Sequence, residues 1–109
     1  MPDLYQILRY QTSNGHQPFT EWWVALRDRI GASIVKAHVD RMELGHFGKR
    51  RWVGDGVWEL KITFGPGYRV YYVMDREHVI ILLCGGDKGA QDRDIARAKE
   101  YATDYWRRV

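Results

Sequence analysis

The sequence predicts an α+β fold in which helices pack on a small, twisted sheet that contains a three-stranded antiparallel meander. Three observations carry this prediction. Apolar residues recur at helical spacing near both ends of the chain, they alternate with polar residues in its middle, and glycine-rich turns separate these segments. The expected order is a strand, two helices, a meander of three strands and a C-terminal helix. A chain of 109 residues has room for a modest core, so residues 1–109 are expected to form a single domain.

The N-terminal third is predicted to open with a strand and to continue as a helix. Residues 4–10 are rich in Leu, Ile and Tyr and precede a Ser-Asn-Gly turn, which indicates a first strand. Pro18 suits the first turn of a helix, and apolar residues then follow at helical spacing as far as Ile30. Gly31 suits the position just after the end of this helix.

A second helix is expected to follow so closely that the two helices form a hairpin. Ser33 suits its N-cap, an apolar stripe runs from Val35 to Met42, and Gly45 offers a C-terminal stop. Residues 46–56 lack a periodic pattern and are rich in Gly, Lys and Arg around a single Trp. They are therefore predicted to form a basic loop.

The middle of the chain is predicted to form a hairpin with one buried face. Apolar and polar residues alternate through residues 58–74 on both sides of a Gly-Pro-Gly turn. If this turn closes a regular hairpin, Thr63 lies opposite Arg69, since paired positions sum to a constant. Lys61 then lies opposite Tyr71, and all four side chains are expected to share the solvent-exposed face. The opposite, core-facing side chains are Trp58, Leu60, Ile62, Val70, Tyr72 and Met74.

The last third is predicted to complete the meander and to cover it with a helix. An uninterrupted apolar run from Val79 to Cys84 indicates a strand buried on both faces. Cys84 is the single cysteine, so it cannot form an internal disulfide, and it is interpreted as a small buried hydrophobic residue. The final helix is expected to begin near Gln91, with an apolar stripe of Ile95, Ala98, Ala102 and Tyr105 or Trp106.

The overall charge of the chain is mildly basic. Lysine and arginine total 17 against 14 acidic residues, which gives a formal net charge of +3 and a pI of about 9.1. This balance permits an anionic partner without proving one. No apolar run approaches the ~20 residues of a membrane span. The N-terminus also lacks the features of a secretion signal, so a cytoplasmic protein without a membrane partner is expected.

Several kinds of catalytic site are disfavoured by the residues present. The histidines lie far apart without Cys or carboxylate residues at ligand spacing, so neither a metal nor another cofactor is expected. The sequence has no Gly-x-Ser-x-Gly motif, no His arranged around Cys84, and no evident carboxylate pair. The glycine-rich residues 85–89 could receive an anion before the last helix but lack the spacing of a P-loop. The remaining possibilities are a reaction without a metal ion and no catalysis at all.

Two groups of residues are candidates for binding RNA. The predicted exposed face of the hairpin combines cations, a hydroxyl and a phenol, which suit phosphates and an unstacked base. Its members are Lys61, Thr63, Arg69 and Tyr71. The predicted basic loop places three cations beside an aromatic residue: Lys49, Arg50, Arg51 and Trp52. On spacing alone, an ordinary solvated sheet face and a solvated loop explain both groups better.

Longer motifs give the chain a family resemblance. They are Gly-Val-Trp-Glu-Leu-Lys-Ile at 56–62, Phe-Gly-Pro-Gly-Tyr-Arg-Val-Tyr-Tyr at 64–72, and Leu-Leu-Cys-Gly-Gly-Asp-Lys at 82–88, followed by Gln91 and Asp94-Ile95. With these motifs the chain resembles RelE/ParE toxins, in particular the phage-derived killer proteins of addiction modules close to HigB. The resemblance covers nearly the whole chain and agrees with the element order derived from periodicity.

This resemblance implies a RelE-like fold and the toxin of a type II toxin–antitoxin system. RelE-like members cleave mRNA on the ribosome without a metal and so inhibit translation. A cognate antitoxin, usually a helix-turn-helix protein, neutralises such a toxin. In the reaction the 2′-hydroxyl attacks its own phosphate, so the enzyme must remove a proton, stabilise charge and protonate the leaving oxygen.

The resemblance also assigns residues to the reaction. Arg69, in the Gly-Tyr-Arg motif, matches the charge-stabilising arginine, and Lys88 matches a basic residue that binds phosphate or assists the leaving group. Lys61 matches a lysine on the strand before the turn. On this basis Arg69→Ala is expected to abolish toxicity while leaving the fold and antitoxin binding intact.

The general acid and base stay open, because the chain departs from RelE at two positions. Glu59 stands where RelE has a second basic residue, and it can act as a base only if it lies near the phosphate. Asp94 stands where RelE has a C-terminal tyrosine. Tyr101 or Tyr71 could replace that phenol if the fold brings either of them to the site.

Two other functions remain open. A ParE-like toxin shares the fold but inhibits DNA gyrase by binding it, and would not need Lys61, Arg69 and Lys88 to converge. A non-catalytic module would use its basic face to bind RNA or the acidic surface of an antitoxin. Translation and supercoiling assays distinguish the first alternative, and variants of Arg69 and Lys88 distinguish the second.

Overall fold

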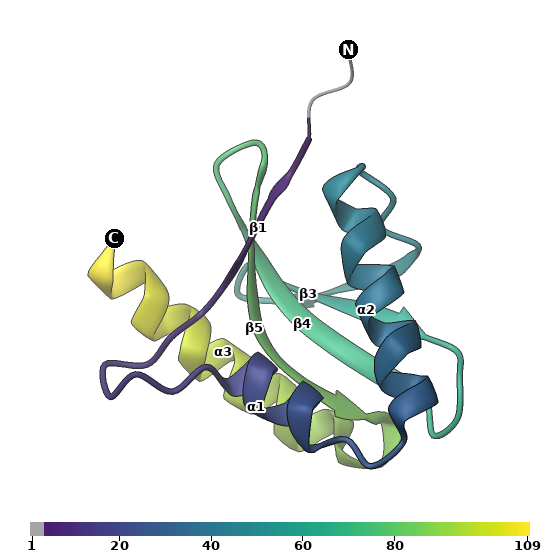
Figure 1. Cartoon of the computed structure of the whole chain (residues 1–109). Helices are drawn as coiled ribbons and strands as arrows, with labels where there is room; N and C mark the ends of the chain where they lie inside the picture. Colours follow the sequence, from purple (N-terminus) through teal and green to yellow (C-terminus); the bar gives the residue numbers. More distant parts are fainter. Residues whose placement is uncertain (1–3) are drawn as a thin grey trace.

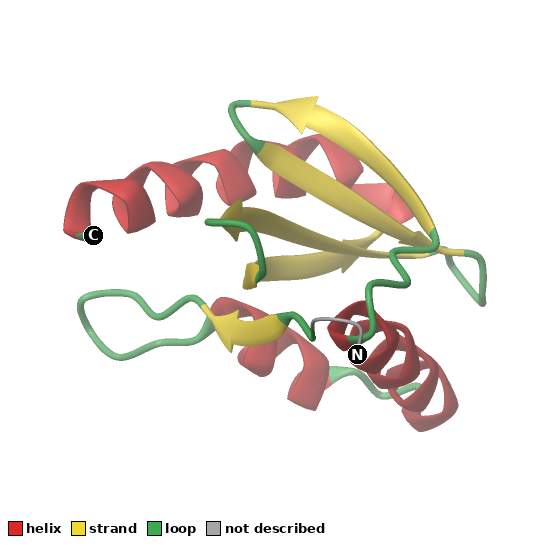
Figure 2. Ribbon diagram, turned by 90° about the horizontal axis from the view of Figure 1, so that it is seen from above, coloured by secondary structure: helices red, strands yellow, loops and turns green. Residues whose placement is uncertain are grey.

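A five-stranded sheet lies between α3 on one face and α1 and α2 on the other, as Figure 1 and Figure 2 show. The computed structural model describes residues 4–109, and it confirms the predicted α+β fold class. The elements are, in chain order, β1 (Gln6–Arg9), α1 (Pro18–Ala25), α2 (Arg29–Glu43), β2 (Lys49–Gly54), β3 (Val57–Ile62), β4 (Tyr68–Asp75), β5 (Val79–Asp87), the short 3-10 helix η1 (Lys88–Ala90) and α3 (Gln91–Arg108). No helix within residues 4–109 has both the length and the apolar character of a membrane span.

The strand order is β1-β5-β4-β3-β2, with β1 parallel to β5 and the other neighbours antiparallel. The predicted meander is confirmed as β3, β4 and β5. β5 has neighbours on both sides, and its residues from Ile80 to Cys84 are buried, as the apolar run predicts. The two outermost strands, β1 and β2, come from the N-terminal segment and from the predicted basic loop.

The prediction of a loop at residues 46–56 is wrong for most of that segment, because β2 pairs there with β3. Lys49 lies opposite Lys61, and Arg51 lies opposite Glu59. An edge strand needs only backbone pairing, and both faces of β2 stay largely exposed along its first four residues. The segment therefore lacks the alternation of apolar and polar residues by which the other strands could be predicted.

The boundary between the first two helices also differs from the prediction. α2 begins at Arg29, before the predicted stop at Gly31 and the predicted cap at Ser33. Asp28 is the cap: its Oδ1 accepts a 2.8 Å hydrogen bond from the Gly31 amide, and its Oδ2 accepts one of 2.8 Å from the Tyr68 hydroxyl. A Cβ at Gly31 would lie 2.3 Å from Asp28 Oδ2, so this glycine permits a close approach inside the helix.

The register of the β3–β4 hairpin is shifted by two residues from the prediction. Arg69 lies opposite Lys61 rather than Thr63, because five residues connect the strands instead of a three-residue turn. A shift of two leaves every strand side chain on its predicted face. Accordingly, the predicted inward residues pack beneath α1 and α2; they are Trp58, Leu60, Ile62, Val70, Tyr72 and Met74.

The opposite face of the sheet was predicted to be wet, and this is wrong for two of its four residues. Tyr71 has no exposed surface and Arg69 is 4% exposed, whereas Lys61 and Thr63 are exposed. The cause is α3, whose buried Ala98 and Ala102 lie in a second core with Tyr71 and Val73. The sheet therefore carries a core on each face, and only the end near the start of α3 stays open.

Candidate functional site

Two rows of side chains cross β2, β3 and β4 on the face that α3 covers. Cross-strand pairing aligns the members of each row, and alternate residues of a strand share a face. The first row consists of three cations: Lys49, Lys61 and Arg69. The second row, two residues further along each strand, consists of Arg51, Glu59 and Tyr71. Residues from the predicted loop and from both strands of the hairpin thus meet on one surface.

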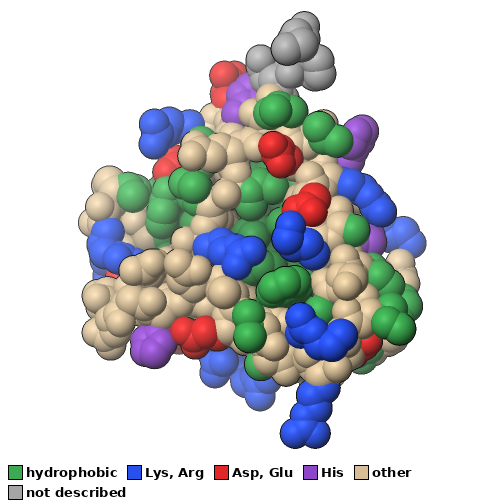
Figure 3. Space-filling view, viewed as in Figure 1, with side chains coloured by type: hydrophobic (Ala, Val, Ile, Leu, Met, Phe, Trp, Pro, Cys, Tyr) green, Lys and Arg blue, Asp and Glu red, His purple; other side chains and the backbone are tan. Residues whose placement is uncertain are grey.

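A cavity of about 630 Å³, the Glu59 cavity, opens over these rows. Its lining residues are Gly48, Lys49, Arg50, Arg51, Glu59, Lys61, Arg69, Lys88 and Gln91. Glu59 is the single carboxylate among them. Such an excess of positive charge favours a polyanion such as the RNA backbone. On the α1 and α2 side of the molecule, shown in Figure 3, Lys and Arg side chains are instead dispersed among apolar, uncharged and acidic side chains.

Glu59 is the hub of the cavity, and its side chain is only 3% exposed. Its Oε2 accepts hydrogen bonds from the Tyr71 hydroxyl at 3.0 Å and from Gln91 Nε2 at 2.8 Å. Its Oε1 lies 3.4 Å from Arg51 Nε and 3.8 Å from Arg69 Nε. Two donors and two guanidinium groups thus compensate the loss of hydration of this buried carboxylate.

Tyr71 acts in this network as a donor. Burial, followed by the charge of Glu59 and the hydrogen bond to it, raises the pKa of the Tyr71 phenol far above its ordinary value of 10.0. The phenol therefore keeps its proton at neutral pH. This geometry does not support the hypothesis that Tyr71 stacks on an exposed RNA base, because the ring is fully buried.

Arg69 is held by the turn that precedes it. Its Nη1 donates to the Gly67 carbonyl at 2.9 Å and to the Tyr68 carbonyl at 3.3 Å, whereas Nε has no hydrogen-bond acceptor among residues 4–109. A Cβ at Gly67 would lie 3.2 Å from Arg69 Nη1 and 3.5 Å from Lys88 Cβ. Arg69 and Lys88 thus meet at Gly67, with the arginine buried and the lysine exposed beside it.

The other predicted RNA-binding residues lie at the margin of the cavity or outside it. The Arg50 guanidinium packs on the opposite face of the sheet, 4.4 Å from the Phe47 ring centroid and 4.6 Å from that of Trp58. Trp52, which is 59% exposed, lies on edge strand β2 opposite Trp58. Thr63 lies beyond the end of β3 and lines a neighbouring cavity. These three side chains do not join the two rows.

Asp94 and Tyr101 line a separate cavity of about 220 Å³ on the other side of the η1–α3 segment. Asp94 is 5% exposed, and desolvation raises its pKa above the ordinary value. The Tyr101 ring packs on Tyr10 with a centroid distance of 5.1 Å. Neither residue lines the Glu59 cavity, so of the four acid–base candidates only Glu59 lines it together with the cations. Tyr71 lies buried behind Glu59 and donates a hydrogen bond to it. Nearby, Asp87 accepts a hydrogen bond from the Gly89 amide, which occupies one donor of the predicted anion site.

Gln91 is the site residue that sequence reasoning missed. The sequence analysis names it as the start of the last helix and as part of the family motif, but not as a site residue; its side chain reaches Glu59, which is 32 positions away in the chain. The sequence gives one weak signal for this role: Gln91 lies three residues after Lys88, a predicted site residue that lines the same cavity. Within the described residues, no three His, Cys, Asp or Glu side chains are grouped to hold a metal ion.

Residues 21–104 match the family described as "Phage derived protein Gp49-like (DUF891)". This match includes every residue that lines the Glu59 cavity. An uncharacterized protein of Haemophilus influenzae is 41% identical over 86 residues, which cover 79% of this chain and 87% of that protein. The chain therefore belongs to the Gp49-like family of phage-derived proteins, which is part of the RelE/HigB-like toxin superfamily and is associated with the toxins of toxin–antitoxin systems.

Proposed function

We propose that this protein is the toxin of a type II toxin–antitoxin system and that it cleaves mRNA without a metal ion, thereby inhibiting translation. The observation that carries the proposal is the gathering of cations over the buried carboxylate Glu59 in one cavity. Membership of the Gp49-like family supports the assignment as a toxin. A surface that only bound an acidic partner would not need a carboxylate at the centre of its cations.

The proposed reaction is a transesterification within the RNA. The 2′-oxygen forms a bond to the adjacent phosphorus while the bond from phosphorus to the 5′-oxygen breaks, which leaves a 2′,3′-cyclic phosphate and a 5′-hydroxyl. A base takes the proton of the 2′-hydroxyl, and the leaving 5′-oxygen gains a proton. Cations near the phosphate stabilise the additional negative charge that develops on its oxygens.

Glu59 is the proposed base. Tyr71 and Gln91 both donate to its Oε2, which orients the carboxylate and leaves Oε1 beside the two guanidinium groups. Arg51 lies nearest to Oε1, but its side chain is 61% exposed, so it is free to move aside for the RNA. As the base, Glu59 takes the proton through Oε1, the oxygen that neither Tyr71 nor Gln91 occupies.

Lys61 and Lys88 are the proposed contacts to the scissile phosphate, because both are exposed at the cavity. Lys88 also assists the leaving oxygen in this proposal. Arg69 is not the proposed clamp on the phosphate, because its Nη1 already donates to the Gly67 and Tyr68 carbonyls. The positive charge of Arg69 instead stabilises the negative charge on the phosphate from the floor of the cavity, where partial exclusion of water strengthens electrostatic interactions.

The proposed partners are mRNA on the ribosome and a helix-turn-helix antitoxin, as the family resemblance implies. An antitoxin that presents acidic groups to the Glu59 cavity would neutralise the toxin by excluding RNA. Expression of the toxin with and without the protein encoded by the neighbouring reading frame tests this part: relief of growth inhibition supports the pairing, and persistent inhibition contradicts it.

The test of the enzymatic proposal is primer extension on transcripts after brief induction of the protein. We expect new 5′ ends within translated regions, and we expect Lys88→Ala to reduce them by roughly a hundredfold, as for the loss of one positioned catalytic cation. Lys36→Ala is the matched control, since Lys36 is an exposed lysine of α2 that pairs with Asp40 outside the cavity. Inhibition of DNA supercoiling with intact transcripts would contradict the proposal and favour a gyrase inhibitor.

A further inference from the structure

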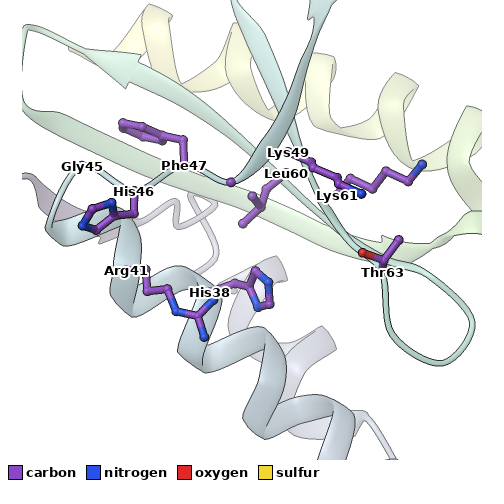
Figure 4. A pocket seen from close by; sticks show the side chains of 10 residues that line it. His38, Arg41, Gly45, His46, Phe47, Lys49, Leu60, Lys61 and Thr63 are labelled. Atoms are coloured by element: carbon purple, nitrogen blue, oxygen red, sulfur yellow. The ribbon is translucent and has the colours of Figure 1, made fainter.

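A second cavity of about 630 Å³ lies between α2 and the end of the sheet where β2 begins and β3 ends. Figure 4 shows Arg41 and His38 on α2, His46 on the segment that follows this helix, and Lys61 and Thr63 on the strand side of the cavity. This space, the Arg41 cavity, takes no part in the chemistry proposed above.

The two cavities adjoin, because Gly48, Lys49 and Lys61 line both of them. Lys49 and Lys61 are direct cross-strand partners, and Lys61 also pairs with Arg69. Cationic side chains therefore follow one another from Arg69 through Lys61 and Lys49 to Arg41. The phosphates of one RNA strand, which recur along its length, need a continuous line of this kind.

The cations of the Arg41 cavity are available to a ligand. No carboxylate lines the cavity, and within residues 4–109 no acidic side chain pairs with Arg41, Lys49 or Lys61. By contrast, Lys36 lies on the same helix and is neutralised by Asp40 at 2.9 Å. Unpaired cations around a concave surface attract an anion more strongly than the same cations paired with carboxylates.

Other groups at the Arg41 cavity suit a nucleotide rather than an isolated phosphate. The exposed hydroxyl of Thr63 and the exposed ring of His46 can hydrogen bond to a ribose or a base. These residues come from the β3–β4 connection and from the segment after α2, so they lie on opposite sides of the opening. The space between them exceeds what a phosphate alone would fill.

We infer that the Arg41 cavity is a second subsite for single-stranded RNA, which holds a nucleotide neighbouring the cleaved bond. This inference rests on the proposed function. In this proposal Arg41 and Lys49 contact the same phosphate, and the RNA strand crosses from one cavity to the other along Lys49 and Lys61.

Fluorescence anisotropy with 2′-O-methyl RNA tests the inference, since RNA without the nucleophilic hydroxyl binds but is not cleaved. The probes are an oligonucleotide of about three nucleotides, which fits one cavity, and one of about eight, which spans both. We expect the longer probe to bind at least about tenfold more tightly to the unaltered chain. Arg41→Gln is expected to remove most of this advantage. It should also reduce the slope of log affinity against log salt concentration by about 0.7, because one phosphate fewer is neutralised.

The control is Lys36→Gln, which removes one charge from the same helix outside the cavity and is expected to leave the binding of both probes unchanged. Equal loss in the two variants, or an Arg41→Gln variant that retains the length advantage, would overturn the second subsite while leaving the proposed cleavage intact. If the unaltered chain bound neither probe, the subsite would fail, whereas primer extension after induction would still decide the proposed cleavage. Tighter, Arg41-dependent binding of poly-glutamate than of RNA would overturn the inference in favour of an acidic protein partner.

Discussion

The hydroxyl of Tyr71 donates a 3.0 Å hydrogen bond to Oε2 of Glu59, the residue directly opposite it on the neighbouring strand. Tyr71 is fully buried and Glu59 is 2% exposed. A buried carboxylate is costly in a small domain, and two apolar residues at this cross-strand pair would pack without that cost. Polar groups that break the local packing rules are expected mainly at functional sites, and this pair lies at the floor of the cationic cavity.

Replacement of Glu59 by glutamine tests whether this carboxylate acts in the reaction. Glu59→Gln keeps the volume of the side chain but removes its charge and its capacity to take a proton. We expect the rate of RNA cleavage to fall by about 10²–10⁴. Tyr71→Phe is the comparison, because it removes one hydrogen bond and retains the base; its rate should fall much less, with a stability loss of about 1–2 kcal/mol. Wild-type cleavage by a folded Glu59→Gln variant would exclude Glu59 as the base.

Arg69→Ala is expected to destabilise the fold, which revises the sequence-based expectation of an intact fold. The change removes a buried guanidinium that binds two backbone carbonyls and lies 3.8 Å from Glu59. Loss of one partner from a buried charged network costs about 3–5 kcal/mol, which urea denaturation can measure. Arg69→Lys keeps the charge and should unfold at an intermediate urea concentration. An Arg69→Ala variant as stable as the unaltered chain would contradict the structural role.

Asp94 is expected to give the folded chain a distinct pH dependence. Desolvation raises its pKa above the ordinary value of 3.8, so its contribution to stability is greatest below that value and is lost as the pH rises through the folded-state pKa. Asp94→Asn should therefore gain stability relative to the unaltered chain as the pH rises above 3.8. The measurement is the difference in urea midpoint between the two proteins across this range.

Asp104 provides the opposite control for that experiment. The hydrogen bond from Tyr10 lowers the pKa of Asp104, so its contribution to stability is present above the ordinary pKa and is lost as the pH falls through the folded-state value. Asp104→Asn should therefore lose stability relative to the unaltered chain as the pH rises. If both variants shifted in the same direction, the assigned environment of Asp94 would be wrong.

Cys84 is expected to resist alkylation in the native protein. The thiol is 5% exposed, and burial raises its pKa to about 12, so almost none of it is the reactive thiolate at neutral pH. Mass spectrometry after treatment with iodoacetamide should show an unmodified chain under native conditions and one adduct after denaturation in urea. Rapid native labelling would mean that the strand β5 opens readily or that the thiol is accessible.

Local sequence patterns predicted those parts of the fold that depend on neighbouring residues. The alternation around Lys61 and Arg69 placed these side chains on one face. The predicted register was wrong by two residues, but the predicted face was still correct because side chains alternate with a period of two along a strand. The stop at Gly45 was also correct, since this residue has a φ of 83°, which favours glycine. The apolar run before Cys84 predicted a strand with both faces covered, as β5 is.

The amino-acid sequence by itself thus determined the fold class, the faces of the central strands and the cationic residues of the candidate site, because period and motif are properties of local order. Only the tertiary structure decided that residues 49–54 form a strand, that α3 buries Tyr71, and that Gln91 reaches Glu59. These outcomes depend on backbone pairing with β3 and on which helix covers the sheet. Such contacts join segments far apart in the chain, and no local pattern specifies how much water they exclude.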